Sequence, residues 1–455
     1  MLTLLDDLTQ QLPPGVVVTD PDVVQGYRRD RCDLVDAGSP LCVVRAASTA
    51  DVATTLAWAT RHRIPVVPRG AGTGLSGGAH AIDGGIVLSL ERMTAVREID
   101  PQGRLAVVEA GVINADVGRA VAAHGLFYPP DPGSFEISTI GGNLATNAGG
   151  MRCVKYGVTR DAVLGLEVVL ADGRILNVGG RTVKNVAGLD LTSLFVGSEG
   201  TLGVITAATL RLRRAPAVPP TTFAATFPRL QEAGRAVSAI VASGAVPSLL
   251  ELMDRETINA VEDHRRMDLD RQAAALLIGQ ADGPDAESQV ALMTACAEAA
   301  GADFVLTTAD PVEGDALLMA RRLAGFATME KGPCVIEDVG VPPHLLVELI
   351  SEVQRVADEC GIRIATVGHA GDGNLHPTLM LPDLDESTRV RALHAADRIS
   401  RAAIALGGTI TGEHGIGALK QRWLADQLDP LAGEVSTAVK FALDPAGILN
   451  PGRGF

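Results

Sequence analysis

The sequence predicts an α+β chain with at least two domains, and three observations support this. Its 455 residues exceed what one compact core normally holds. Short β-rich runs alternate with glycine-rich turns up to about residue 214, whereas residues 221–360 mix long helical patterns with strands. A proline-containing stretch at 213–220 separates the two textures. We therefore expect one domain over 1–216, a second over 217–408 and a C-terminal segment over 409–455.

Local patterns predict individual elements within this plan. Residues 1–7 are typical of a helix start, and β-rich runs predict strands further along. A glycine- and aspartate-rich turn between two β-rich runs predicts a hairpin over 362–377. The expected strands are 64–68, 85–90, 105–109 and 274–279, and further helices are expected from 418 and before 450.

Composition excludes several classes of protein. Hydrophobic residues make up 47% and charged residues 20%, which is ordinary for a globular chain. The net charge of -15 and the scarcity of aromatic residues, at 3%, disfavour a nucleic-acid or anionic-membrane surface. Six scattered cysteines without a C-x-x-C pair argue against a disulfide framework, a cysteine zinc site and an iron–sulfur cluster. With no long apolar run and no secretory leader, we expect a cytoplasmic protein that reaches a membrane only through a partner.

Glycine is unusually abundant, with 50 residues, and in the first domain it gathers at 70–78, 133–150 and 197–203. The first cluster contains a literal G-x-G-x-x-G, but no crossover helix fits before the next strand and no Gly-Lys-Ser/Thr follows. We therefore reject a nicotinamide Rossmann unit and a P-loop. Plain glycine-rich turns are one interpretation. Backbone N–H groups that cradle a diphosphate are the other, and three clusters in one domain favour an extended ligand.

Together these clusters carry a resemblance. Arg69–Thr73, Ile140–Asn143 with Ala148–Gly150, and Gly197–Gly203 resemble the FAD-binding domain of the vanillyl-alcohol oxidase flavoprotein superfamily, from about Leu41 to the C-terminus. The narrower likeness is to its D-lactate dehydrogenase, glycolate oxidase flavoprotein subunit and D-2-hydroxyglutarate dehydrogenase branch. It implies a two-part FAD-binding domain, an α+β cap domain for substrate, and a C-terminal segment that returns to the flavin.

The same resemblance implies which residues hold FAD. The stretch 70–78 contains no histidine for a covalent link, so non-covalent FAD is expected. Leu189 stands where relatives often carry Tyr. The implied pyrophosphate cradle is Pro68, Arg69, Gly70, Ala71, Gly72, Thr73 and Gly74. The residues implied to line the rest of FAD are Pro132, Gly133, Ser134, Gly142, Asn143, Thr146, Gly149, Gly150, Glu199, Gly200 and Ile205, with Asn450 near the ring.

Histidines and a carboxylate gather in two later glycine clusters. His369 and His376 flank the predicted hairpin turn, and Glu413 and His414 lie between glycines. Two imidazoles and one carboxylate suit Zn²⁺ or another divalent ion in an open, catalytic site, although each histidine could instead be a hydrogen-bonded loop residue. The resemblance implies that His369, His376 and Glu413 are metal ligands and that His414 is the general base.

A substrate carboxylate needs a cationic partner, and arginine binds carboxylates in a planar, bidentate way. The run Leu317–Arg322 resembles the family's helix that delivers this arginine, with Arg321 at the matching position and Leu318 where relatives carry Trp. Substrate binding by Arg321 and Asn374 is the implied role. A surface pair of arginines is the plain alternative.

The leading hypothesis is an FAD-dependent dehydrogenase that oxidises a small D-2-hydroxy acid, such as D-lactate, glycolate or D-2-hydroxyglutarate, by hydride transfer to flavin N5. Electrons would leave to a separate acceptor: a quinone, an electron-transfer flavoprotein, a cytochrome or iron–sulfur subunits. One alternative is a flavin-binding subunit of a larger oxidoreductase complex with little activity alone. A metallohydrolase is another, although it leaves the glycine clusters without a use.

Overall fold

The computed structural model describes residues 2–454, and the chain divides into two compact units. Unit 1 contains the chain up to Gly149, then Val158–Ala215, and the segment from Glu413 onward. Unit 2 contains Gly150–Gly157 and Pro216–Gly412. The first of these two segments is an excursion that the sequence did not indicate.

The first sheet of unit 1 has four strands in the order β1-β2-β4-β3. Strands β2, β4 and β3 are parallel, and β1 pairs antiparallel with β2. Helix α3 (Thr49–His62) begins where the Ser48 side chain accepts the Asp51 N–H, and it ends at Arg63, whose φ is 52°. Helix α1 (Leu2–Gln11) and α3 contribute to the core on this sheet, which includes the fully buried Trp58. The strands are β1 Val17–Val18, β2 Cys42–Arg45, β3 Val66–Arg69 and β4 Ile86–Ser89.

Parallel strands β3 and β4 are joined without a helix. Residues 70–85, all of which are described, contain no helical segment. Parallel strands are usually linked through a crossover helix, so this loop departs from the common βαβ unit. The absence of a Rossmann crossover helix, predicted from the sequence, is confirmed.

The second sheet of unit 1 has five antiparallel strands in the order β5-β6-β10-β8-β9. Helices α4, α5 and α7 contribute apolar side chains to its core, as Val117, Leu144 and Phe195 show. The strands are β5 Val96–Asp100, β6 Leu105–Glu109, β8 Val163–Val169, β9 Ile175–Gly179 and β10 Val204–Arg211. The helices are α4 Asn114–Ala122, α5 Ile140–Thr146 and α7 Leu191–Phe195.

Further elements complete unit 1. Strand β7 pairs with β11, and α15 begins at an aspartate N-cap, Asp429, followed by proline. The remaining elements are α2 Pro21–Gly26, β7 Leu126–Phe127, η1 Thr159–Ala162, β11 Arg213–Arg214, α14 Gln421–Gln427 and α15 Pro430–Leu443.

Unit 2 is built on one antiparallel sheet with the order β15-β12-β14-β13-β18-β19-β16, and β17 also pairs with β19. Its central strands are buried along their whole length, β13 and β14 among them. The strands are β12 Thr221–Phe227, β13 Leu249–Asp254, β14 Ala275–Ala281, β15 Phe304–Thr308, β16 Cys334–Ile336, β17 Val339–Gly340, β18 Arg363–His369 and β19 Asn374–Met380.

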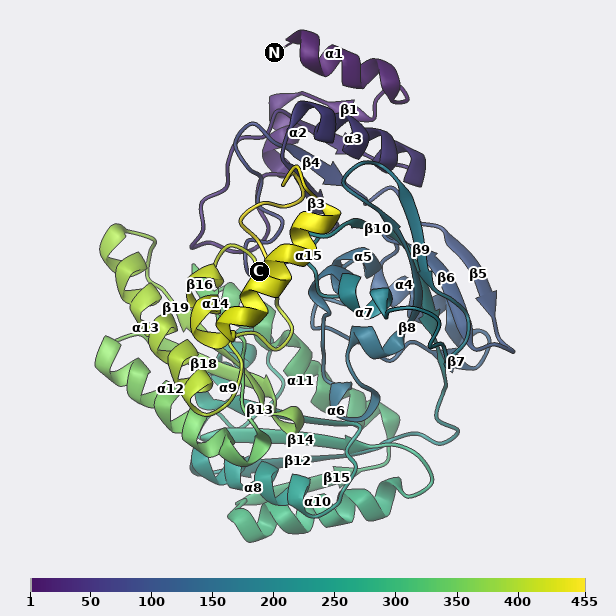
Figure 1. The fold of residues 1–455 in the computed structure, drawn as a ribbon. Coiled ribbons are helices and arrows are strands. Elements are labelled where there is room, and N and C mark those ends of the chain that lie inside the picture. The colour runs from purple at the N-terminus through teal and green to yellow at the C-terminus, as the bar shows by residue number, and fades with distance from the viewer. Residues whose placement is uncertain (1, 455) are drawn as a thin grey trace. The chain divides into compact units, whose positions relative to one another are not determined.

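Helices cover both faces of this sheet, with α9 and α11 on one face and α8 and α10 on the other (Figure 1). Helix α11 begins at Pro311, where the Asp310 side chain accepts the N–H groups of Val312 and Glu313. The helices are α6 Cys153–Tyr156, α8 Leu230–Ala242, α9 Arg255–His264, α10 Ala286–Ala300, α11 Pro311–Met329, η2 Pro343–Leu345, α12 Leu346–Cys360, η3 Ala370–Asp372 and α13 Glu386–Ala405.

These elements confirm the α+β prediction and most local patterns. The predicted strands appear as β3, β4, β6 and β14, and the hairpin appears as β18 and β19. The helix expected from residue 418 begins later, at Gln421, because residues 417–420 form turns. All six cysteines are free. Among the described residues, no helix combines the length and apolar character that crossing a bilayer requires.

Candidate functional site

The three glycine clusters meet within unit 1. A Cβ atom built on Gly70 would stand 2.2 Å from Oγ1 of Thr139, the residue that caps α5. One built on Gly200 would stand 2.9 Å from Cγ of Pro68. Side chains are therefore excluded where the first cluster touches the second, and where the third cluster touches Pro68, which shortly precedes the first.

Unsatisfied polar groups near these contacts fit an extended polar ligand. Within residues 2–454, no protein group accepts a hydrogen bond from the backbone N–H groups of residues 70–76. In the same described part of the chain, Nδ2 of Asn143 and Oδ1 of Asn450 are buried without a hydrogen-bond partner. Buried polar atoms of this kind are normally satisfied, and consecutive free N–H groups form anion-binding concavities. The residues present therefore fit FAD.

Arg69 places a positive charge against the first glycine cluster. Its Nη1 donates to the Arg29 carbonyl over 2.9 Å, and its guanidinium lies 5.8 Å from the centre of the Tyr27 ring. A Cβ on Gly72 would overlap this guanidinium. Burial lowers the pKa of Arg69, with Asp30 and Glu91 opposing that effect. Arginine stays protonated at neutral pH, so the loop carries a fixed charge suited to an anion.

Most of the polar side-chain atoms of Glu199 and Asn450 are hydrogen-bonded to the protein itself. The Glu199 carboxylate accepts the N–H groups of Ile416 and Gly417, each over 2.7 Å. Nδ2 of Asn450 donates to the carbonyls of Gly78 and Glu199, over 3.0 and 2.8 Å. Burial raises the pKa of Glu199, although the two N–H donors oppose it.

The loop that carries His414 is held by the same region of unit 1. Oγ of Ser76 donates to the His414 carbonyl over 3.0 Å. The N–H groups of Ala418 and Leu419 donate to the Ser76 carbonyl over 2.9 and 3.0 Å. The proposed base is thus anchored at its backbone by the first glycine cluster and, through Glu199, by the third.

The other predicted cofactor residues are distributed over several segments of the chain. They lie on β3 and its following loop, after β7, on and after α5, and on β10; Gly150 alone belongs to unit 2. Leu189 lies on an exposed loop, with 87% of its surface accessible. These residues are Pro68, Ala71, Gly72, Thr73, Gly74, Pro132, Gly133, Ser134, Gly142, Thr146, Gly149, Gly150 and Ile205.

In unit 2, the hairpin of β18 and β19 carries His369 and His376. Val367 pairs with His376 and His369 with Asn374, so the two histidines are diagonal neighbours on one face of the sheet. Their ring centres lie 5.1 Å apart with the planes at 82°. Both are buried, at 6% exposure. Gly373 closes the turn with φ 79°, and a Cβ there would stand 2.0 Å from the Val341 carbonyl oxygen.

Glu251 on β13 joins His369 to Arg321. Glu251 pairs directly with His369 across the sheet, and the histidine Nδ1 lies 2.9 and 3.0 Å from the two carboxylate oxygens. Arg321 on α11 donates from Nε to Oε2 over 2.5 Å. Burial alone would raise the pKa of Glu251, but His369 and Arg321 outweigh it and hold that pKa below its ordinary value.

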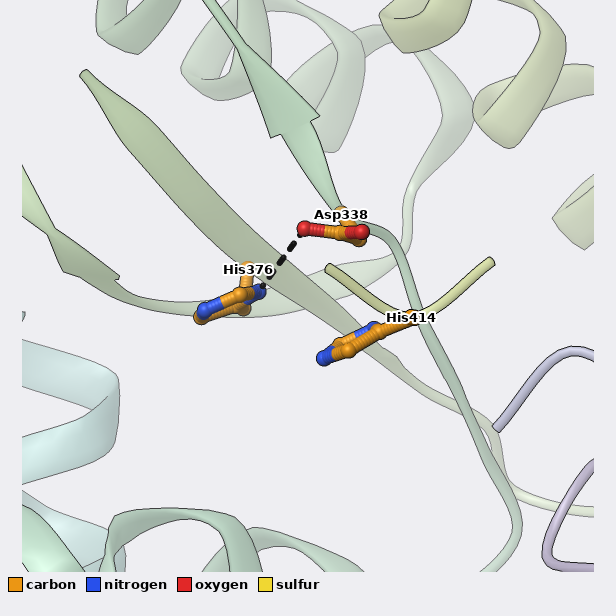
Figure 2. Close-up of side chains that lie close together, drawn as sticks. All are labelled: Asp338, His376 and His414. Atoms are coloured by element: carbon orange, nitrogen blue, oxygen red, sulfur yellow. Dashed lines mark ion pairs between the residues drawn. The ribbon is translucent and has the colours of Figure 1, made fainter. Parts of the chain in front are cut away.

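Asp338 lies on the other side of the hairpin, between β16 and β17. Its Oδ1 accepts the Asn374 amide over 2.9 Å, and its Oδ2 accepts the Thr411 hydroxyl over 2.8 Å. Oδ1 also lies 3.5 Å from Nδ1 of His376, the ion pair drawn in Figure 2. The Asn374 amide further donates to the Val339 carbonyl over 3.2 Å.

Gly412 brings the chain back to this hairpin. A Cβ on Gly412 would stand 2.5 Å from Nδ2 of Asn374, so a larger residue there would displace the Asn374 side chain. Glu413 and His414 directly follow Gly412 in the chain and begin the last segment of unit 1. Nε2 of His414 lies 3.6 Å from Oε1 of Glu413.

Glu251 and Asp338 were missed from the sequence. Glu251 stands in the apolar run Leu249–Met253, where a lone carboxylate in a strand is costly unless it is paired. The isolated carboxylate is visible in the sequence, but the partners of Glu251, Arg321 and His369, are 70 and 118 residues away along the chain. Leu318, one turn before Arg321, packs into the apolar core of unit 2.

The comparisons with known proteins identify the class of protein first. Residues 40–179 match the model of an FAD binding domain, and residues 220–453 match that of the C-terminal domain of FAD linked oxidases. The chain belongs to the FAD-linked oxidase family. It is an FAD-dependent oxidoreductase acting on a CH–OH group.

Individual relatives narrow the branch to the one that the sequence resembles. The chain is 42% identical to the glycolate oxidase subunit GlcD of Bacillus subtilis, over 91% of this chain and 89% of that one. It is 39% identical to the D-lactate dehydrogenase of Archaeoglobus fulgidus, over 92% of each. A crystal structure of p-cresol methylhydroxylase with substrate bound shares the fold, with a TM-score of 0.84 and 17% identity. The match covers 99% of this chain and 96% of that one. The predicted vanillyl-alcohol oxidase type of fold is confirmed.

Proposed function

We propose that this protein is a dehydrogenase that oxidises a small D-2-hydroxy acid to the 2-oxo acid and passes the electrons to a separate acceptor. The observation that carries the proposal is the cluster of Arg321, Glu251 and His369, which joins a carboxylate-binding cation to an imidazole inside unit 2. The relatives named for glycolate and D-lactate support a substrate of this class.

Arg321 would bind the substrate carboxylate. Its Nε is engaged by Glu251, so the terminal nitrogens are the groups available for a second carboxylate. His369, His376 and Glu413 would hold a divalent cation, probed first as zinc, beside the substrate hydroxyl. Two buried histidines of one hairpin, with a carboxylate on the returning chain, have the donor chemistry of such a site.

When bound, FAD supplies a two-electron acceptor for the Cα hydride, and the cation supplies a Lewis acid that lowers the pKa of the hydroxyl. His414 would take the hydroxyl proton, since a neutral imidazole accepts protons at neutral pH. The substrate thereby loses one proton and one hydride and becomes the 2-oxo acid. Asn374 would act with Arg321 at the substrate, and the glycine clusters of unit 1 would hold FAD non-covalently.

Anaerobic spectroscopy of the purified protein tests the proposal. Visible flavin bands should bleach with at least one of glycolate, D-lactate and D-2-hydroxyglutarate, and should persist with L-lactate and L-2-hydroxyglutarate. Persistent bands with every acid would contradict it. That outcome would favour the second candidate, a flavin-binding subunit with little activity alone, which the word "subunit" in the name of the Bacillus relative supports.

The electron acceptor would be a quinone or a separate protein, with iron–sulfur subunits among the candidates. The cytoplasmic location inferred from the sequence stays a prediction. We likewise propose that the domains divide at 216–217 and 408–409, with FAD held by the first part and substrate by the second.

A further inference from the structure

We propose that Glu251 is a positioning residue that fixes the tautomer of His369 and the orientation of Arg321, so that both are ready before substrate or cation arrives. This rests on the proposed function, because it assigns His369 to a cation and Arg321 to the substrate. Nothing in the sequence resemblance pointed to this strand residue.

The first step is the chemistry of the His369 contact. An ionised carboxylate only accepts hydrogen bonds. Nδ1 of His369 lies 2.9 Å from Oε1 and 3.0 Å from Oε2 of Glu251, so Nδ1 must carry a proton in this contact. In the neutral ring, Nε2 then keeps its lone pair. A histidine that binds a metal through one nitrogen commonly donates from the other to a carboxylate in this way.

The second step concerns Arg321, which would otherwise favour the opposite tautomer. Its Nη2 lies 3.5 Å from Nδ1 of His369. A guanidinium only donates, so without Glu251 it would donate to Nδ1 and move the imidazole proton to Nε2. With Glu251 present, Arg321 donates from Nε to the carboxylate over 2.5 Å instead.

The third step is rigidity. Glu251 is fully buried on a central strand and lies opposite His369 in register, so the carboxylate has one place to point. Arg321 is 7% exposed and held on α11. The Glu251 carboxylate thus fixes the guanidinium of Arg321 on a helix and the imidazole of His369 on a neighbouring strand. It also neutralises the buried positive charge of the guanidinium.

The proposed test is selective ¹⁵N-histidine labelling of the cation-free protein, with the His369 signal assigned by its loss in His369→Asn. Wild type should show the Nδ1–H tautomer. Glu251→Gln should show Nε2–H, because the Nε–H of Arg321 needs the single amide oxygen as its acceptor and the amide NH2 then faces Nδ1 of His369. Affinity for zinc, measured by competition with a chromophoric chelator, should fall roughly 10- to 100-fold in Glu251→Gln.

Asp254→Asn is the matched control. Asp254 is a buried carboxylate on the same strand, but it accepts from Thr257 and Thr366 rather than from the histidines. It should leave the His369 tautomer and zinc affinity unchanged. If any buried carboxylate on this strand simply supported the fold, both variants would change the His369 tautomer and the zinc affinity to the same extent.

An Nε2–H tautomer in wild type overturns the inference even if Glu251→Gln fails to fold. So does a Glu251→Gln protein with the wild-type tautomer and zinc affinity. If wild type binds no zinc, the proposed cation role fails, whereas the tautomer comparison still decides the role of Glu251.

Discussion

The guanidinium of Arg321 donates from Nε to the Glu251 carboxylate over 2.5 Å, and both side chains are buried. A buried cation that is tied at one nitrogen keeps its plane fixed while its terminal nitrogens stay available. This arrangement gives the clearest prediction about substrate binding.

Arg321→Lys should raise the KM for the 2-hydroxy acid by about 10- to 100-fold, because an ammonium cannot reproduce the planar fork that binds a carboxylate. Steady-state kinetics with an artificial electron acceptor measures this. Arg322→Lys, the adjacent change on the same helix, is the control and should leave KM near wild type. An unchanged KM in Arg321→Lys would remove the residue from the substrate site.

His414→Ala should keep bound FAD but slow anaerobic flavin reduction by roughly 10²- to 10⁴-fold, the usual range for loss of a general base. Stopped-flow absorbance follows the flavin directly. His344→Ala, at an exposed position of η2, should behave as wild type. If the flavin of His414→Ala were reduced at the wild-type rate, His414 could not be the general base.

Removing divalent cations by dialysis against a chelator should abolish reduction by substrate while leaving the flavin bands in place. The flavin bands should persist because the proposed cation ligands, His369, His376 and Glu413, are not among the residues proposed to hold FAD. Zinc should restore the rate, and elemental analysis should find about one equivalent in the active protein. Full activity of protein shown to be metal-free would contradict the cation's role.

Glu199→Ala should destabilise the protein by roughly 2–4 kcal/mol, because it leaves the N–H groups of Ile416 and Gly417 without their charged acceptor. Since these groups belong to the loop after His414, flavin reduction should also slow. Denaturant unfolding gives the free energy, and Glu298→Ala, at an exposed helix position, provides the baseline. A loss of unfolding free energy below about 0.5 kcal/mol, typical of surface substitutions, would show that the Glu199 hydrogen bonds contribute little to stability.

Asp254 should make stability depend on pH. Burial raises its pKa to about 6 against hydrogen bonds that favour the ionised form. The folded-state pKa lies above the unfolded value of about 3.9, so the contribution is complete below pH 4 and is lost as pH rises through 6. The shift of about two units corresponds to about 3 kcal/mol.

Asp254→Asn lacks this titration. The unfolding free energy of wild type, relative to that of Asp254→Asn, should therefore fall as the pH rises from 4 to 6. Above pH 6 it should not change further. A difference that does not vary over this range would contradict the raised pKa.

Much of the fold and part of the candidate site could be predicted from local sequence. The hairpin around His369 and His376 follows from two β-rich runs and a turn that needs glycine at 373. The glycine clusters predicted a backbone-bound ligand because their residue type and spacing are local properties. The side-chain engagement of Glu199 and Asn450 with the protein backbone could not be seen in the same way, since their partners are far along the chain.

The family, the α+β elements and the residue types available for FAD, carboxylate and cation could all be inferred from the order of the amino acids. Which of these residues meet depends on how the chain packs. Packing paired Glu251 with both Arg321 and His369, set Asp338 beside Asn374 and His376, and drew Gly150–Gly157 into unit 2. The physical reason is that burying a charge is costly until opposite charges and hydrogen-bond donors from distant segments surround it, and those partners exist only once the sheet and helix have packed.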